Sequence, residues 1–503
     1  MRIARRLMRQ DAELMWMNRD RPMLTASNIH YEIAERTKAI AAGGIGVMHR
    51  LAQHVGLIGE IDQQVHLLKR HLPYHESDHV MSIAYNVLTG GHCLEDLELR
   101  RNDEVFLDAL GARRIPDPTT AGDFCRRFDT ASIEALMSAV NETRLRVWRQ
   151  QPDAFFERAV IDADGTLAPT TGERKEGMNI AYDGTWGYHP LVVSLASTQE
   201  PLFLVNRSGN RPSHEGAGER FDQAIELCRR AGFRSVLLRG DTDFSQTKHL
   251  DGWDDAQVTF LFGIQRSQPL YDLAANLPET EWKPLVRPPK YDITTRERAR
   301  RENVREQVVV ERGFINIRPG AEQVASFDYR PTACEKTYRV VALAKNISKL
   351  RGEDVLVDDI MIFFFITNDR RTPADELVLL ANERCNQENL NAQLQSTGVN
   401  AMRMPVDTLE SNWAYMVMAS IAWTLKAWFA LLLPEDGRWS ESRRAEKRRV
   451  LTMEFRTFLN AFMLMPCQIV RTARKVIYRL LSWSPWQPVL FRALDALSCP
   501  LRQ

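Results

Sequence analysis

The sequence feature that most restricts the fold of this chain is an acidic residue at the end of two apolar, strand-like runs. The run 159–163 ends at Asp164, and the run 235–238 leads to Asp241. Between them the pattern predicts two strands and one amphipathic helix, at 191–195, 202–205 and 218–231. Short apolar runs combined with a helical repeat are typical of an α/β sheet. The sequence therefore predicts an α/β core in which neighbouring strands bring Asp164 and Asp241 together.

The first 150 residues have the spacing of a helical region. Apolar side chains recur every three or four residues over 45–55, as one face of a helix requires. Further on, Thr119 or Thr120 can cap a new helix close to a group of basic residues. That group consists of Arg113, Arg114, Arg126 and Arg127. We expect an all-α DNA-binding region over 1–150, although a solvated helical surface fits these residues equally well.

Strand patterns return after residue 265 and interrupt the core. The segment 266–358 is predicted as a β-rich insertion domain between two core segments, 155–265 and 359–433. Its expected strands are at 308–310, 314–317 and 338–343. In the second core segment we expect a buried strand at 361–366 and one long helix at 373–395.

The end of the chain, 434–503, is predicted as a basic helical region and a candidate pairing surface for two copies. Between Arg438 and Arg479 there are 11 basic residues against 3 acidic ones, although the whole chain carries a net charge of only +1. The most apolar stretch, 413–433, contains Lys426, which favours a buried core helix over a membrane span. The chain start lacks the apolar run of a signal peptide, so we expect no membrane partner and a cytoplasmic location. Seven cysteines without a Cys-x-x-Cys pair fit a reducing compartment.

The candidate catalytic acids are Asp164, Asp241 and Glu388. Two aspartates at strand ends and a glutamate on a following helix can converge on two Mg²⁺ ions, with Mn²⁺ as a substitute, because hard cations bind carboxylate oxygens. Two such ions activate a water or a 3′-hydroxyl and stabilise the leaving oxygen of a phosphodiester. Asp162 lies on the same face of the strand as Asp164, so it is an alternative metal ligand.

The helix expected at 373–395 carries Arg384, Glu388 and Gln395 on one face. An arginine one turn from a metal-binding glutamate can hold a phosphate while the acid holds the ion. A surface ion pair would give the same spacing. The buried strand that precedes this helix favours the functional interpretation.

Four motifs together resemble the DDE transposases of bacterial insertion sequences. They are Ile161-Asp-Ala-Asp-Gly-Thr166, Leu238-Arg-Gly-Asp-Thr-Asp243, Phe365-Ile-Thr-Asn368 and Asn382-Glu-Arg-Cys-Asn-Gln-Glu-Asn389. The resemblance extends over residues 44–433. It implies a ribonuclease H-like core interrupted by a β-rich insertion domain, with Asp164, Asp241 and Glu388 as metal-binding acids. In the family's helix signature a tyrosine and a lysine stand where this chain has Ala381 and Gln395. Those two residues help bind the phosphates of the transferred end in the family, so this chain is expected to bind them differently.

The resemblance implies cut-and-paste transposition in the bacterial cytoplasm, at the nucleoid. A homodimer would bind the terminal inverted repeats, nick each end of the element, form hairpin ends through the freed 3′-hydroxyl and reopen them. The same 3′-hydroxyl would then join target DNA. Relatives hold a flipped base on a tryptophan of the insertion domain, which makes Trp282 the candidate here. Packing inside the insertion's own core is the alternative, and the favoured one, for Trp282.

Basic residues along the chain are candidate DNA contacts, because each neutralised phosphate releases counterions. The candidate DNA-binding residues are Arg126, Arg127, Trp282, Arg287, Arg298, Arg301, Arg384, Arg444 and Arg448. Interleaved glutamates allow solvated helices as an alternative for about half of each basic cluster.

Two other functions fit part of the pattern. The segment from Val160 to Leu167 matches the strand-end signature of haloacid dehalogenase-like phosphatases, in which Asp162 would form an aspartyl-phosphate. A transposase-derived DNA-binding regulator without catalysis would use only the helical start and the basic tail. The phosphatase leaves Arg384 and Glu388 unexplained, and the regulator does not need the three acids. The transposase interpretation accounts for all of these residues.

Overall fold

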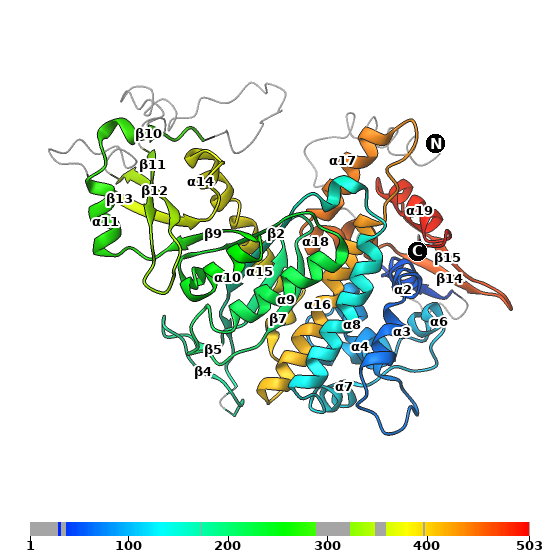
Figure 1. Ribbon diagram of the computed structural model, residues 1–503. Helices are drawn as coiled ribbons and strands as arrows, with labels where there is room; N and C mark the ends of the chain where they lie inside the picture. Colours follow the sequence, from blue (N-terminus) through cyan, green and yellow to red (C-terminus); the bar gives the residue numbers. More distant parts are fainter. Residues whose placement is uncertain are drawn as a thin grey trace, which may run out of the picture.

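The computed structural model describes residues 29–31, 37–172, 174–287, 322–347, 359–395 and 398–501. The candidate DNA contacts Arg298 and Arg301, and the strands expected at 308–310 and 314–317, lie outside these ranges. Figure 1 shows a mixed α/β molecule in which one large sheet runs from the upper left to the centre, with helices packed around its central part. The predicted α/β class is confirmed.

One mixed sheet contains nine of the strands in the described part of the chain. Its central strands β8, β9 and β2 run parallel, and the remaining neighbours pair antiparallel. In spatial order the strands are β10 (Lys283–Pro284), β11 (Glu322–Tyr329), β12 (Tyr338–Asn346), β13 (Ile360–Thr367), β9 (Thr259–Ile264), β8 (Val236–Gly240), β2 (Ala159–Gly165), β6 (Leu191–Leu195) and β7 (Glu200–Val205). The sequence pattern did not predict β9, because a short apolar run does not distinguish a strand from a buried helical segment.

Helices cover both faces of the central sheet, which is why its strands are apolar on both sides. On one face lies α9 (Ala217–Ala231), whose Phe221 ring meets the ring of Phe262 at a centroid distance of 5.7 Å. On the other face, α14 (Ala374–Asn382) places Leu377 in an apolar cluster with Leu237 and Leu261. The helix α15 (Cys385–Leu394) follows α14 and contacts β2. The sheet thus presents one face to α9 and the opposite face to α14 and α15.

The single helix expected over 373–395 is two helices, and the cause lies in the sheet. Arg239 Nη1 of β8 donates to the carbonyl oxygen of Leu380 at 2.7 Å, which is the acceptor that the Arg384 amide would use in a continuous helix. The Arg384 amide bonds to the Ala381 carbonyl instead, at 3.3 Å. The prediction of one long helix was therefore wrong, and the break sets Arg384 at the start of α15.

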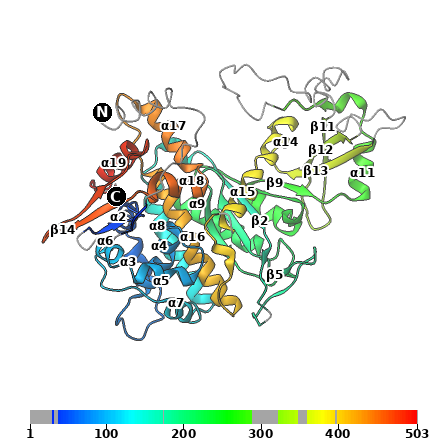
Figure 2. The same ribbon diagram turned by 180° about the vertical axis from the view of Figure 1, so that it is seen from behind.

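The N-terminal helices pack around one long helix, α16 (Leu409–Leu431), as the view from behind shows (Figure 2). Among the described helices, α16 is the one that is long and apolar enough to cross a membrane, but its apolar window is entirely buried inside the molecule. The prediction of a core helix at 413–433 agrees with this burial. The surrounding helices are α2 (Ile45–His54), α3 (Leu57–Gln64), α4 (Glu76–Leu88), α5 (Leu97–Arg101), α6 (Glu104–Leu110), α7 (Pro118–Cys125) and α8 (Thr130–Trp148).

The two ends of the described chain lie side by side and share a small sheet. Its strand β14 pairs with β1 near the chain start and with β15. The elements involved are β1 (Ala39–Ile40), α17 (Ser440–Leu451), α18 (Phe455–Phe458), β14 (Cys467–Arg471), β15 (Val476–Leu480) and α19 (Gln487–Ala496). The predictions of a helical end and an all-α start were wrong at these strands: β14 and β15 form a local hairpin, and β1 joins it from a distant segment whose pairing leaves no mark in local periodicity.

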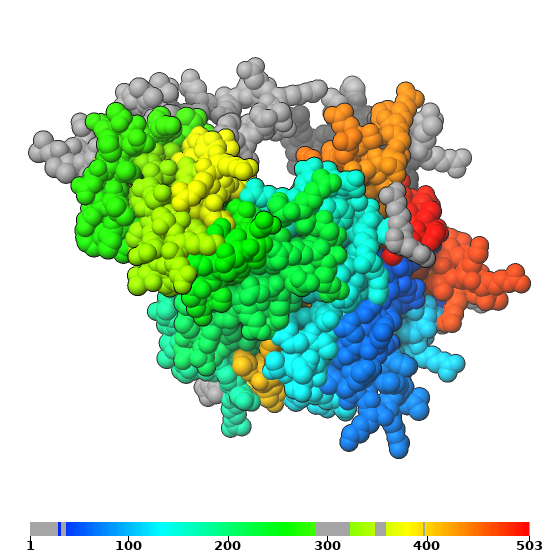
Figure 3. Space-filling view, viewed as in Figure 1, coloured from blue at the N-terminus to red at the C-terminus, as the bar shows by residue number. Residues whose placement is uncertain are grey.

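The described strands of the segment 266–358 continue the core sheet. β12 pairs with β13 along its whole length, and β13 pairs with β9 of the core. With α11 (Gln268–Ala275) and α14, these strands form the green and yellow lobe in the space-filling view (Figure 3). The lobe is therefore joined to the core by an unbroken ladder of strand pairing.

A buried cluster around Glu200 connects three elements of the core. The Glu200 carboxylate accepts hydrogen bonds from Arg144 Nε at 3.0 Å, from Trp148 Nε1 at 2.9 Å and from Trp428 Nε1 at 2.8 Å. These donors come from α8 and α16, and Glu200 begins β7. The cluster ties the N-terminal helices to the edge of the sheet.

Candidate active site

Two of the predicted acids meet at one edge of the sheet because their strands are parallel neighbours. In the register of β2 and β8, Asp162 lies opposite Arg239, and two residues further along both strands are Asp164 and Asp241. Asp241 directly follows β8 and caps the short 3₁₀ helix Thr242–Phe244, its carboxylate accepting from the Asp243 amide at 2.9 Å. The predicted proximity of the two aspartates is thus a consequence of strand register.

The helix α15 brings Glu388 to the same edge through a row of amide side chains. Gln387 Nε2 donates to the Val192 carbonyl of β6 at 3.2 Å, and the Ser194 hydroxyl donates to Gln387 Oε1. One turn later, Asn391 Nδ2 donates to Asp164 Oδ2 at 3.0 Å. These contacts fix the rotation of α15 about its axis, and Glu388 therefore projects beside Asp164.

Arg384 connects two of the three acids. Its Nη1 lies 3.7 Å from Asp164 Oδ2, and its Nη2 lies 3.4 Å from Glu388 Oε1. The Arg384 and Asp164 side chains are 18% and 13% exposed, whereas Glu388 is 60% exposed. Arg384 is therefore positioned to contact both the acids and a group that enters from solvent.

The electrostatics of the site are those of crowded carboxylates. Burial raises the pKa of Asp164 to about 7, Arg384 acts against that rise, and the charges of Asp241 and Glu388 add to it. Burial also raises the pKa of Asp241, opposed by the hydrogen bond from the Asp243 amide and by Arg384. One arginine does not compensate three acids, so the site favours additional positive charge.

This donor set fits divalent cations. Carboxylate oxygens are the ligands that Mg²⁺ prefers, and clustered acids with raised pKa values gain from a cation. Within the described residues, no three acidic, histidine or cysteine side chains are already close enough to enclose an ion. Asp164, Asp241 and Glu388 would therefore have to close around it, with Glu388 turning away from Arg384.

We expect the affinity of this site for Mn²⁺ to fall about tenfold for each pH unit below about 7. The folded-state pKa of Asp164 lies above its usual value, so the folded protein retains a proton there up to about pH 7. Its contribution to stability is therefore present at low pH and is lost as the pH rises through that pKa. A metal ion must displace this proton at lower pH. Calorimetric titration at several pH values measures the effect, and Asp164→Asn should remove most of it; a pH-independent affinity in the wild type would contradict the prediction.

Asp162 belongs to a different structure. Arg239 Nε and Nη2 donate to its two carboxylate oxygens at 2.7 and 2.8 Å, and the two side chains are only 2% and 1% exposed. Arg239 also reaches Glu383 at 3.3 Å. Asp162 is thus occupied in holding the end of α14 to the sheet. Of the two aspartates on β2, Asp164 is the one that lies near Arg384 of α15, whereas Asp162 is held by Arg239.

We expect Asp162→Asn to lower the free energy of unfolding by about 2–3 kcal/mol, because it weakens charge-assisted hydrogen bonds to a buried guanidinium. Asp164→Asn should leave stability unchanged or raise it, because it removes one of three crowded carboxylates. Urea denaturation of both variants measures the difference. Equal losses would contradict the division of roles between them.

A cleft of about 830 Å³ opens beside α15. Gln395 lies in its lining, where its Nε2 donates to the Thr166 hydroxyl just after β2 at 2.8 Å. Across from it are Lys175, Arg403 and the half-exposed ring of Trp186, which begins β5 (Trp186–Tyr188). Burial and the nearby Arg403 lower the pKa of Lys175, whose Nζ donates to the Met404 carbonyl. The cleft thus begins near the end of β2, the strand that carries Asp164, and its lining includes basic and aromatic side chains and one acid, Glu95.

The other candidate DNA contacts do not gather into one patch. Arg126 bonds to Asp123 and Asp407, both at 2.8 Å, near the end of α7. Arg287 pairs with Glu322, and Trp282 packs partly buried against the main apolar core. The other candidates are Arg127, after α7, and Arg444 and Arg448, exposed on α17. Figure 1 places α7 and α17 at opposite ends of the molecule.

Sequence reasoning missed three residues that shape this site: Arg239, Gln387 and Asn391. Arg239 could have been noticed as a charge inside an apolar strand. Gln387 and Asn391 lie three and seven residues after Arg384, on the helix face that carries the functional residues. Their amide groups gave no separate signal, because amides at this spacing are common on solvated helices.

Comparison with known proteins gives one family match. The sequence matches the family model described as "Transposase DDE domain group 1" over residues 35–500. The fold resembles a chain of the solved structure titled "Cryo-EM structure of piggyBac transposase synaptic complex with hairpin DNA (SNHP)", with 9% sequence identity and a TM-score of 0.38, covering 92% of this chain and 86% of that chain. A search of curated proteins gave no match.

Proposed function

Because the chain belongs to the family described as Transposase DDE domain group 1, we propose that it cuts and joins DNA at the ends of an insertion sequence with Asp164, Asp241 and Glu388. The observation that carries this proposal is the meeting of these acids around Arg384. Two come from the ends of adjacent parallel strands, and the third comes from a helix docked on the same edge. Family membership supplies the reaction class, and this arrangement supplies the residues.

In this proposal Asp164, Asp241 and Glu388 would hold two Mg²⁺ ions, or Mn²⁺ in their place. When bound, the ions would supply an activated water or 3′-hydroxyl and stabilisation of the leaving oxygen. Asn391 orients Asp164 through its 3.0 Å hydrogen bond, as partners of metal ligands do. Arg384 holds the reacting phosphate through its guanidinium once the acids are neutralised.

We further propose that the reaction is cut-and-paste transposition by a homodimer on the terminal inverted repeats, with hairpin ends and transfer to target DNA, in the cytoplasm at the nucleoid. The strand order β7-β6-β2-β8-β9 supports a ribonuclease H-like core. The strands β10 to β12, between Asp241 and Glu388 in the chain, support a β-rich insertion. We assign the bound DNA to the cleft beside α15. There Lys175 and Arg403 would contact phosphates, and Trp186 would stack against a base.

The phosphatase alternative is not supported. Its nucleophile would be Asp162, which is buried and held by both Arg239 nitrogens. An aspartyl-phosphate at this position would require the ion pair to break and leave Arg239 buried without its partner.

The test uses the DNA that flanks the gene as the substrate. The wild-type protein with Mg²⁺ should cleave this DNA at defined ends and give hairpin-sized products on a denaturing gel, and a chelator should abolish both. Binding to the ends without cleavage under any metal condition would support the non-catalytic regulator and overturn the transposase proposal. Cleavage that does not depend on a divalent metal would overturn the proposed role of the acids.

A further inference from the structure

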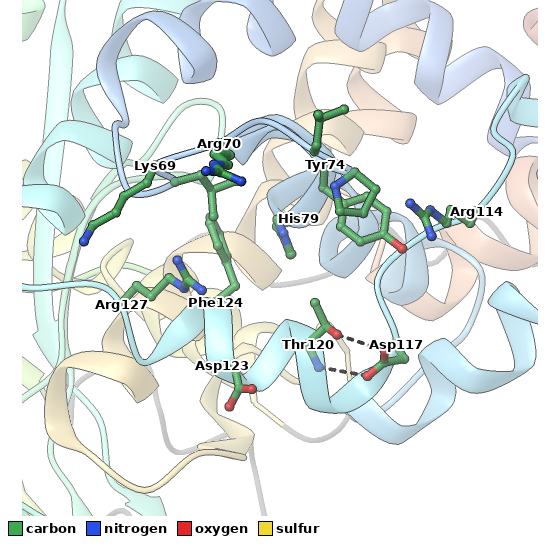
Figure 4. Close-up of a pocket in the computed structure, with 13 residues that line it drawn as sticks. Lys69, Arg70, Tyr74, His79, Arg114, Asp117, Thr120, Asp123, Phe124 and Arg127 are labelled. Atoms are coloured by element: carbon green, nitrogen blue, oxygen red, sulfur yellow. Dashed lines mark hydrogen bonds between the residues drawn. The ribbon is translucent and has the colours of Figure 1, made fainter.

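A second pocket, of about 590 Å³, lies among the N-terminal helices and away from the three acids. The loop before α4 forms one wall, and α7 with the residues around it forms the other, as the close-up shows (Figure 4). Pockets of about 300–1,000 Å³ are typical of sites for small ligands. The proposed reaction assigns this pocket no role.

The rim of the pocket carries more positive than negative charge. Four cationic residues line it, and none of them forms an ion pair with an acid in the part of the chain that the structure describes. These residues are Lys69, Arg70, Arg114 and Arg127. The two acids in the lining are already occupied. Asp117 caps α7 by accepting from the Thr120 amide and hydroxyl, both at 2.8 Å, and Asp123 pairs with Arg126. The rim therefore favours an anion such as a phosphate.

The floor of the pocket contains a buried polar atom without a partner. His79 is 4% exposed, its ring stacks on Phe124 at a centroid distance of 4.2 Å, and its Nδ1 has no hydrogen-bond partner. Burial, together with the nearby charge of Arg127, lowers the pKa of His79 to about 4, so the imidazole is neutral at pH 7. A neutral ring nitrogen in this position suits an uncharged polar group of a ligand. Leaving Nδ1 unpaired and closed to solvent has a free-energy cost, which a polar group that reached it would remove.

The walls between rim and floor are apolar and aromatic. Leu68, Pro73 and the half-buried ring of Tyr74 form them, and the Arg114 guanidinium lies 5.7 Å from the centroid of the Tyr74 ring. A flat ring with polar edges fits such walls, since bases stack on aromatic and guanidinium planes. The pocket thus combines a rim for a phosphate with an interior for a base.

We propose that this pocket binds one unpaired nucleotide of a DNA strand, with its phosphate on the cationic rim and its base against Tyr74 and His79. The inference rests on the proposed function, which supplies the DNA. The strand that supplies this nucleotide would come from the cleft beside α15, because α7 lies between this pocket and that cleft. Arg126, next to Arg127, bonds to Asp407, and the Asp407 carbonyl accepts from the Glu176 amide at 2.7 Å, directly after Lys175 in the cleft. The linings of the cleft and the pocket are thus connected through α7 and Asp407, and in this proposal a strand that leaves the cleft crosses α7 to the pocket.

The test measures a ratio of two affinities, without metal, by fluorescence anisotropy. One probe is a blunt duplex from the flanking DNA, and the other is the same duplex with an unpaired extension of about four nucleotides. The wild type should bind the extended duplex on the order of tenfold more tightly, the size expected for one stacked base. Arg127→Gln and His79→Phe should each bring the ratio down to about twofold or less. His79→Phe preserves the stack on Phe124 and removes the nitrogen.

The matched control is Arg149→Gln, which removes an exposed arginine at the end of α8, outside the pocket lining, and should keep the wild-type ratio. If His79→Phe does not fold, as judged by circular dichroism, Lys69→Gln at the exposed rim replaces it. A wild-type ratio near one, or an unchanged ratio in the pocket variants, would overturn the inference. Free dTMP that binds as tightly as the extended duplex would assign the pocket to a free nucleotide and overturn the DNA source. Because no cleavage is required, the ratio is informative even if the proposed reaction fails.

Discussion

Replacing Asp241 by asparagine should slow metal-dependent strand cleavage by about a thousandfold or more, equivalent to about 4 kcal/mol of transition-state stabilisation. Asparagine keeps the shape of the side chain and can still accept from the Asp243 amide, so the 3₁₀ turn after β8 remains capped. It lacks the charge that the proposed metal site needs beside Asp164. Single-turnover cleavage of labelled duplex measures the loss, and anisotropy should show DNA binding within about threefold of the wild type.

Asp243→Asn is the matched control for this prediction. Asp243 is two residues away on the same turn and is exposed, and its backbone amide donates to the Asp241 carboxylate. We expect its cleavage rate to stay within about threefold of the wild type. Equal losses in the two variants, or more than about a tenth of the activity in Asp241→Asn, would remove Asp241 from the proposed active site.

Replacing Glu200 by glutamine should lower the free energy of unfolding by about 3–5 kcal/mol. The variant leaves the Arg144 guanidinium fully buried without an opposing charge. It also turns one acceptor of the cluster into a donor, facing a site where Arg144, Trp148 and Trp428 already donate. The midpoint and slope of urea denaturation, followed by tryptophan fluorescence, measure the change.

Glu142→Gln is the control for the stability prediction. Glu142 also lies on α8 and pairs with Arg230 at 2.7 Å, but both side chains are open to solvent. A surface pair of this kind contributes about 0–1 kcal/mol. A similar loss in both variants would mean that the buried cluster has no special part in stability.

The sequence predicted the elements whose signal is local. The runs that end at Asp164 and Asp241 are apolar on both faces, and the helix over 218–231 has one apolar face, so periodicity identified all three. The proximity of Asp164 and Asp241 was predicted because the ends of neighbouring parallel strands meet at one edge of a sheet. The spacing of Arg384 and Glu388 predicted that they share a helix face, and the structure places their side chains 3.4 Å apart.

The features that hydrophobic periodicity did not predict are set by contacts between segments far apart in the sequence. Asp162 and Asp164 are equivalent in the strand pattern, and only Arg239 on the adjacent strand distinguishes them. The same arginine takes the Leu380 carbonyl and breaks the predicted long helix. The hairpin near the end of the chain also pairs with β1, far away in the sequence. Each of these features is a contact between two segments, and the hydrophobic pattern of neither segment gives any sign of it.

The strand pairing from β7 to β10 is unbroken, so the sheet holds its outer strands at a fixed distance from the strands that lead to the acids. A hinge between the outer lobe and the core would require strand pairing to open, and β13 pairs with β12 over its whole length and with β9 over Phe364–Thr367. Any DNA held by the outer strands would therefore sit at a set spacing from Asp164 and Asp241. The position of the cut, counted in base pairs from the bound segment, would then be a property of the sheet and not of the flanking sequence.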